Sequence, residues 1–172
     1  MIYDVVTLDD IKKVQKKVTA HSKSIEEVVM QIIRPYSKDL DKYVEFIRNC
    51  LSDGENSPTD AELEDYCMNL ATYIYFAGGM VEQLGIKDDV SKAIYKEMYH
   101  SSRNDLDKGT VADKDSLAEL SSQTEFLTNV CYHRAWQIMK SKVENAQELL
   151  SSIKKVLTRR MNEYQLTHMV NN

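Results

Sequence analysis

The last 63 residues, from Thr110 to Asn172, contain neither glycine nor proline. The whole chain of 172 residues has only five glycines and two prolines. A sandwich or barrel of many strands needs turn residues every ~8–12 positions, and this chain does not supply them. The sequence therefore predicts an all-α fold with long carboxy-terminal helices, in which roughly the last 60 residues are almost wholly helical.

Two capping patterns precede apolar residues at helical spacing near the amino terminus. Thr7 with Asp10, and Ser24 with Glu27, each place an oxygen acceptor three residues before a carboxylate. They predict short helices near 8–20 and 25–34. Pro35 is expected to end the second, because it has no amide hydrogen and restricts the residue before it. A third helix is expected over 37–51.

The stretch SDGENSPT, residues 52–59, is the one clear linker. It separates an amino-terminal helical extension, residues 1–51, from the region 60–172. Thr59 with Glu62 predicts the start of a helix that stops near Gly85, and a further helix is expected over 88–107. Within the first of these, adjacent glycines cost a helix roughly 2 kcal/mol relative to alanine, so Gly78-Gly79 predicts either a kink or the close approach of another backbone, and we favour the close approach.

The glycine-free region is expected to begin at a third capping pair, Thr110 with Asp113. Polar residues around Ser121–Thr124 interrupt the apolar spacing of its first part. The second part is continuous, and the sequence predicts that a break between the two helices falls near 142–146.

Charge is distributed unevenly along the chain. The net charge is −5, from 22 bases and 27 acids, which argues against nucleic-acid binding over the whole surface. Residues 130–172 hold seven bases and three acids, whereas residues 52–66 hold six acids and no base. Any nucleic-acid contact must therefore be local.

The cysteines and the amino terminus bear on the compartment. Cys50, Cys67 and Cys131 match neither a disulfide framework nor a C-x-x-C site. The first ten residues carry acid where a signal peptide needs base, and the longest weakly polar run is far short of the ~18 residues of a membrane span. We expect a soluble cytoplasmic protein, in the host cytoplasm if phage-encoded, with no membrane partner.

The motifs of enzymes and metal sites are missing. There is no phosphate-binding loop of the G-x-x-x-x-G-K-[ST] type and no G-x-G-x-x-G. The pattern Glu97-x-x-His100 occurs once, whereas a helical di-iron site needs two copies. The carboxylate pairs Asp88-Asp89 and Asp113/Asp115 are interpreted as charges near helix starts. The chain is therefore expected not to be an enzyme, with no cofactor and no metal.

Residues 88–106 carry the most informative pattern. At 100° per residue, the basic and aromatic residues fall on one narrow stripe, and the apolar residues Val90, Ile94 and Met98 fall on the far side, where a core is expected. Basic groups with an aromatic ring suit an unpaired nucleic-acid strand. The alternative is an ordinary solvated face. The candidate nucleic-acid-binding residues are Lys92, Lys96, Tyr99 and Arg103.

A second apolar face lies near the carboxy terminus. It is wider than one neighbouring helix needs, so the sequence predicts self-association through 146–164. The bases within it, Lys154, Lys155, Arg159 and Arg160, spread around the helix and are interpreted as aids to solubility or as ion-pair partners. The candidate oligomerisation residues are Leu149, Leu150, Ile153, Val156, Leu157 and Met161.

The order of these features over about residues 60–163 resembles the UvsY family of phage recombination mediators. The resemblance rests on the basic and tyrosine-rich helix Lys92–Arg103, a polar loop, and a small-x-A-D/E-type start in V-A-D-K, 111–114. It continues through the central Trp136, I-M-K-S-K at 138–142, and R-R-M-N-E at 159–163.

The resemblance implies a non-enzymatic, all-helical homo-oligomer that acts in DNA recombination and repair. Such a protein binds single-stranded DNA, helps displace single-strand-binding protein and loads a RecA-like recombinase. The resemblance places the DNA contacts on Lys92, Lys96 and Arg103. Two rivals stay open: an acidic helical structural or assembly protein of a phage, and an inhibitor that uses the acidic run 52–66 to mimic DNA.

Overall fold

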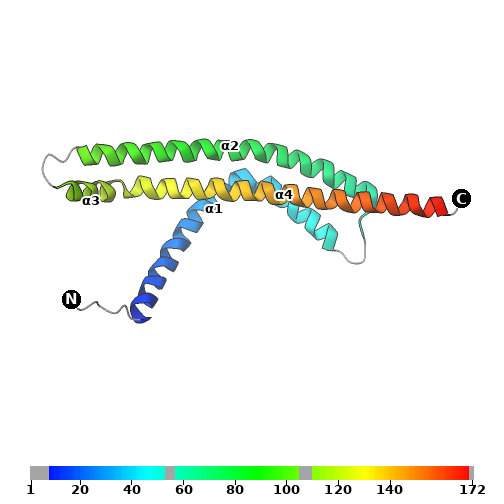
Figure 1. Ribbon diagram of the computed structural model, residues 1–172, viewed down its shortest axis with the longest axis horizontal. Helices are drawn as coiled ribbons and strands as arrows, with labels where there is room; N and C mark the ends of the chain where they lie inside the picture. The colour runs from blue at the N-terminus through cyan, green and yellow to red at the C-terminus, as the bar shows by residue number, and fades with distance from the viewer. Residues whose placement is uncertain (1–7, 53–56, 105–109, 171–172) are drawn as a thin grey trace.

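The computed structural model describes residues 8–52, 57–104 and 110–170, without the side chains of Asp10, His168 and Val170. These residues form four helices and no strand, which confirms the all-α prediction (Figure 1). The helices are α1 (Leu8–Ser52), α2 (Asp60–Asn104), α3 (Val111–Ser121) and α4 (Gln123–Val170).

An antiparallel pair, α2 and α4, runs along the length of the molecule (Figure 1). Two contacts that lie far apart along the pair fix its register: Asp60 meets Arg160, and Asp88 meets His133. The short helix α3 lies in line with α4 beside the end of α2. The second half of α1 packs against the pair, and its first half projects away from it.

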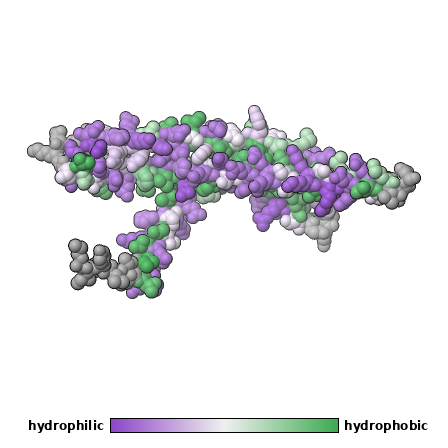
Figure 2. All heavy atoms as spheres, in the orientation of Figure 1, coloured by the Kyte–Doolittle hydropathy of each residue, from purple (hydrophilic) through white to green (hydrophobic). Residues whose placement is uncertain are grey.

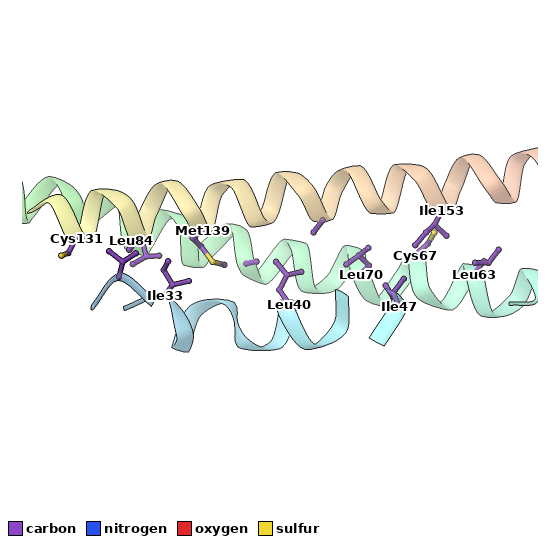
Figure 3. Close-up of a cluster of buried hydrophobic side chains, with 14 residues drawn as sticks. Ile33, Leu40, Ile47, Leu63, Cys67, Leu70, Leu84, Cys131, Met139 and Ile153 are labelled. Carbon is purple, nitrogen blue, oxygen red and sulfur yellow. The ribbon is translucent and has the colours of Figure 1, made fainter. Parts of the chain in front are cut away.

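The core is one long row of side chains where α1, α2 and α4 meet (Figure 3). Ile33 of α1 lies beside Leu84 of α2 and Met139 of α4. Further along, Ile47 lies beside Leu70, and Ile153 of α4 lies beside Cys67. Burying each large aliphatic side chain contributes about 1.5–3 kcal/mol, so this row supplies most of the hydrophobic stabilisation.

Helix α1 is continuous, so the prediction of separate helices over 8–20, 25–34 and 37–51 is wrong. Ser24 is not a cap: it lies within the helix, and its hydroxyl donates to the Ala20 carbonyl at 3.3 Å. Pro35 removes one backbone hydrogen bond, yet the helix continues because Ile33 and Leu40 are buried on either side of it. The helix bends in the part that contains Pro35 (Figure 1). The Thr7–Asp10 pair depends on Thr7, outside the described residues.

Helix α2 is also continuous, which corrects the predicted stop near Gly85 and the separate helix over 88–107. A Cβ at Gly78 or Gly79 would meet nothing within 4 Å, so the expected close backbone approach is absent there. The crowded glycine is Gly85 instead. A Cβ on it would lie 3.3 Å from Trp136 Nε1, and the missing side chain lets the indole pack against α2.

The two later capping pairs are present as predicted. The Thr110 amide and hydroxyl both donate to Asp113 Oδ2, at 3.0 and 2.7 Å, and the Asp113 amide donates back to the hydroxyl. Thr59 and Glu62 form the same box, with 2.7 Å between the Thr59 amide and the carboxylate. The hydrogen bonds from Thr110 lower the pKa of Asp113, and the bond from the hydroxyl contributes more than the bond from the amide.

The break in the glycine-free region lies at Ser122, within the polar stretch, and not near 142–146. The Ser122 hydroxyl donates to the Ala118 carbonyl at 2.7 Å, which satisfies a group at the end of α3. Beyond this residue, α4 runs for 48 residues. Of the proposed linker, the structure describes Ser52 and Ser57–Thr59. Arg160 holds it through Nη1 to the Pro58 carbonyl, at 2.7 Å.

Candidate functional site

The stripe of candidate nucleic-acid-binding residues divides into two pairs. Lys92 and Lys96 are exposed on α2, and neither ammonium has a hydrogen-bond or ion-pair partner in the described part of the chain. They are therefore available to an anionic ligand.

The other pair contacts α3. The Tyr99 hydroxyl donates to Asp115 Oδ1 at 3.2 Å, and Arg103 Nε lies 2.6 Å from the same oxygen. The Arg103–Asp115 contact is a close ion pair, although the Nε–H is not aimed at an acceptor. Partial burial, followed by the Asp115 charge, raises the pKa of the Tyr99 phenol. Asp115 is thus an anchor between α2 and α3, in addition to being a charge near a helix start.

The face opposite the lysines is not a core, contrary to the prediction. Val90 and Ile94 are 52% and 51% exposed, and Met98 is also exposed. At this end of α2 the buried direction is that of Leu84 and Ser91, which face α4, and α1 does not reach this far. About half of the surface of Val90 and Ile94 is therefore left open to solvent.

This open face forms one side of a groove of about 420 Å³, which we call the α2–α4 groove. Helix α2 supplies its apolar wall, and the first turns of α4 supply hydroxyl groups, one carboxylate and an aromatic ring. The lining residues are Ile86, Lys87, Val90, Ser91, Ile94, Thr124, Glu125, Thr128 and Tyr132.

A polar cluster joins α2 to α4 beside this groove. His133 Nδ1 lies 2.9 Å from Asp88 Oδ2, and its Nε2 lies 3.0 Å from the Gln137 amide nitrogen. The Asn129 amide donates to Asp88 Oδ1 at 3.1 Å and to Ser91 Oγ at 3.1 Å. Satisfied polar groups in a helix interface fix the register of the two helices.

Sequence reasoning missed this cluster. The sequence pattern places Asp88 near a helix start, but Asp88 lies in the interior of α2. Its partners lie 41 and 45 residues away, so no local spacing could reveal them. The cluster contains no assembled nucleophile and base. In the described residues no three His, Cys, Asp or Glu side chains are grouped to hold a metal ion.

The candidate oligomerisation face is largely occupied within the chain. Ile153 is 3% exposed and lies in the core, and Leu149, Leu150, Val156 and Leu157 pack around it. Met161 alone of the six is exposed, at 56%. The width of this face is explained by two neighbours, α1 and α2, rather than one. Self-association through it stays a prediction.

The remaining bases differ in their partners. Arg160 is held by the 57–60 segment, Lys142 Nζ lies 2.6 Å from Asp41 Oδ1, and Arg159 pairs with Glu163 at 3.7 Å. Lys154 and Lys155 are exposed. The early part of α1 adds a basic group that sequence reasoning did not single out: Lys12, Lys13, Lys16, Lys17 and Lys23.

Within the described residues, no helix combines the length and the apolar character needed to cross a membrane. No protein family, curated protein or solved structure matches this chain.

Proposed function

We propose that this chain is a single-stranded-DNA-binding recombination mediator, which helps a RecA-like recombinase load onto DNA coated by single-strand-binding protein. Two features support the proposal: an order of motifs that resembles that of the UvsY family, and the exposed ammonium groups of Lys92 and Lys96, which have no partner among the described residues. The second carries it, because no described residue competes with phosphate for those groups.

The acidic net charge is compatible with this function if several copies act together. One copy offers two bases on the stripe, Lys92 and Lys96, that have no partner among the described residues, so we expect each stripe to bind a strand weakly. A homo-oligomer that brings several stripes to one strand multiplies weak contacts through a high effective concentration. We therefore include self-association in the proposal, and the protein partners are the recombinase and the single-strand-binding protein.

Fluorescence anisotropy with a labelled single-stranded oligonucleotide, over a series of salt concentrations, tests the DNA contacts. We expect Lys92→Ala with Lys96→Ala to lower the affinity and to reduce the slope of log affinity against log salt by ~0.7 for each phosphate that is no longer neutralised. The matched control is Lys154→Ala with Lys155→Ala, which removes the same charge from exposed positions of α4. Equal effects of the two pairs would contradict the assignment.

Tyr99 and Arg103 need a different comparison, because both already contact Asp115. If the Tyr99 ring stacks on a base, Tyr99→Ala lowers the affinity with little change in the salt slope, since stacking releases no counterions and is worth ~1–3 kcal/mol. Tyr99→Phe keeps the ring and removes the hydroxyl bond to α3. A loss of affinity with Phe as large as with Ala would assign Tyr99 a structural role.

A second candidate, a helical structural or assembly protein with no DNA role, is favoured by the exposed apolar surface of the α2–α4 groove. The two candidates separate in one assay. An assembly protein shows no salt-dependent binding to single-stranded DNA, and it does not speed the start of recombinase activity on DNA covered by single-strand-binding protein.

A further inference from the structure

The first half of α1, residues 8–28, projects from the rest of the molecule, and we call it the N-terminal arm (Figure 1). Its apolar residues recur at three- and four-residue spacing, as in a helix that packs against others. Val14 and Val18 are each 59% exposed, and Ile11 and Val28 are also exposed. Figure 2 shows hydrophobic residues in green on the arm, with no other element over them.

The second half of α1 shows where such a face belongs. Ile33 lies beside Leu84, and Ile47 lies beside Leu70, so α1 runs antiparallel to α2 (Figure 3). Followed toward the amino terminus, a straight α1 would next pass over residues of α2 beyond Leu84. Those residues are Ile86, Val90 and Ile94, the apolar wall of the α2–α4 groove. The groove is therefore the continuation of the site that α1 occupies in the core.

The chain's own arm does not enter the groove. The helix bends in the part that contains Pro35, and the arm leaves the α2–α4 pair at a steep angle (Figure 1). A proline ring clashes with the carbonyl four residues earlier and so holds a bend of this kind. At the near end of the groove, Lys87 Nζ donates to the Tyr36 hydroxyl at 2.5 Å, which ties α1 to α2 beside the bend.

The charges of the groove and of the arm are complementary. Glu125 lines it, and the Oε2 of this carboxylate is shielded from solvent without a hydrogen-bond partner in the described part of the chain. A buried acceptor of this kind is costly unless a donor reaches it. Residues 11–25 of the arm hold five lysines and no acid. Around the helix axis, Lys12 lies about 120° from Val18 on one side and Lys17 about 100° on the other. Both lysines therefore flank the apolar stripe, where a donor would reach the edge of a groove that holds the stripe.

We propose that the N-terminal arm of a second copy of this chain lies in the α2–α4 groove, with its Ile11, Val14 and Val18 stripe against Val90 and Ile94, and with a flanking lysine at Glu125. Each copy carries one arm and one groove. The contact thus completes, between molecules, the three-helix packing that α1 begins within one. It uses neither Lys92 nor Lys96, and it stands independently of the proposed DNA binding.

Light scattering coupled to size-exclusion chromatography measures the oligomer. Val18→Asp in the arm and Ile94→Asp in the groove are each expected to reduce the mass from that of an oligomer to that of one chain. Both positions are at least half exposed, so neither change disturbs the core. The matched controls, Ala20→Asp and Ala93→Asp, add the same charge at exposed positions outside the stripe and the groove lining, and should leave the oligomer intact.

Mixing the two defective variants gives the sharper test. The Val18→Asp chain keeps a working groove, and the Ile94→Asp chain keeps a working arm, so one arm and one groove can still pair. We expect the mixture to form a species of two chains, although each variant alone is monomeric. Circular dichroism of each variant checks that the helices persist.

Three results would overturn the proposal. The first is a wild-type protein that stays monomeric at about 100 µM, as it would if its own arm filled the groove. The second is an Ile94→Asp chain that still associates, which would indicate arm-to-arm pairing. The third is a mixture of monomers only. Salt-dependent DNA binding by the monomeric variants would even then keep the proposed DNA contacts standing, without the self-association that the proposed function includes.

Discussion

The two halves of α1 have the same kind of sequence and different surroundings. Both carry apolar residues at three- and four-residue spacing, and both belong to one uninterrupted helix. In the second half, Val29, Ile33, Leu40 and Ile47 are buried against α2 and α4. In the first half, Ile11, Val14 and Val18 face outward.

The changeover is gradual along this face: Val18 is 59% exposed, Ile25 is partly buried against the core and Val29 is 3% exposed. At 100° per residue, Ile11 and Val18 fall within about 20° of Val29 and Ile47, so the apolar positions of the arm and of the core half lie on the same side of the helix. Helical spacing therefore predicts that a face of the helix is covered, but it does not predict which element covers it. One continuous face is buried where α1 lies against α2 and α4, and is left open where the bend carries α1 away from them.

The largest expected effect comes from a charge in the covered part. Ile153→Asp places a carboxylate among Cys67 and the core residues of α1 and α2, at a position only 3% exposed. We expect a loss of about 4 kcal/mol or more in the free energy of unfolding, measured with urea. If the variant instead unfolded like the wild type and only lost subunits, Ile153 would belong to an intermolecular face.

A matched pair of truncations compares the halves of α1 directly. Ile33→Ala should cost about 2–5 kcal/mol, because Ile33 is fully buried and the change leaves a cavity. Val18→Ala in the arm should cost less than about 0.5 kcal/mol when the protein is dilute enough to be monomeric. Urea unfolding at low concentration checks both. Similar costs at the two positions would show that the arm is covered within its own chain.

Two glycines of α2, Gly79 and Gly85, compare an open part of its surface with a part that another helix covers. At Gly79 an added Cβ meets nothing within 4 Å, so Gly79→Ala should stabilise the protein by about 0.5–1 kcal/mol through helix propensity. At Gly85 the Cβ would press on Trp136 at 3.3 Å, so Gly85→Ala should gain less or destabilise. Thermal unfolding of the two variants measures the difference. A larger gain at Gly85 would mean that the indole does not pack there.

A smaller effect is expected where α3 begins, far from the three-helix core. Thr110→Ala removes the cap of α3 and should cost about 1 kcal/mol. The cap lowers the pKa of Asp113. The stability that the charged Asp113 contributes is therefore present at neutral pH and is lost as the pH falls below the usual aspartate range. Urea unfolding at pH 7 and at pH 3 should therefore differ less for the variant than for the wild type. An equal difference would contradict this role of Thr110.

The sequence predicted the helical class and the capping boxes at Thr59 and Thr110, because both depend on residues a few positions apart. It failed where distant packing outweighs a local signal. Pro35 and Gly85 each predicted a helix end, yet both lie inside helices that tertiary contacts hold together. The α2–α4 polar cluster and the exposed Val90–Ile94 face depend on which helices lie beside α2, and no local pattern contains that information.

Hydrogen exchange along α1, at low and at high protein concentration, tests most directly the claim that its halves are covered by different molecules. At low concentration we expect slow exchange from Val29 to Ile47 and fast exchange over residues 11–25. At high concentration, residues 11–25 should become protected together with residues 86–94 and 124–132 of the α2–α4 groove. Protection of the arm that is the same at both concentrations, or that rises without the groove, would contradict the account.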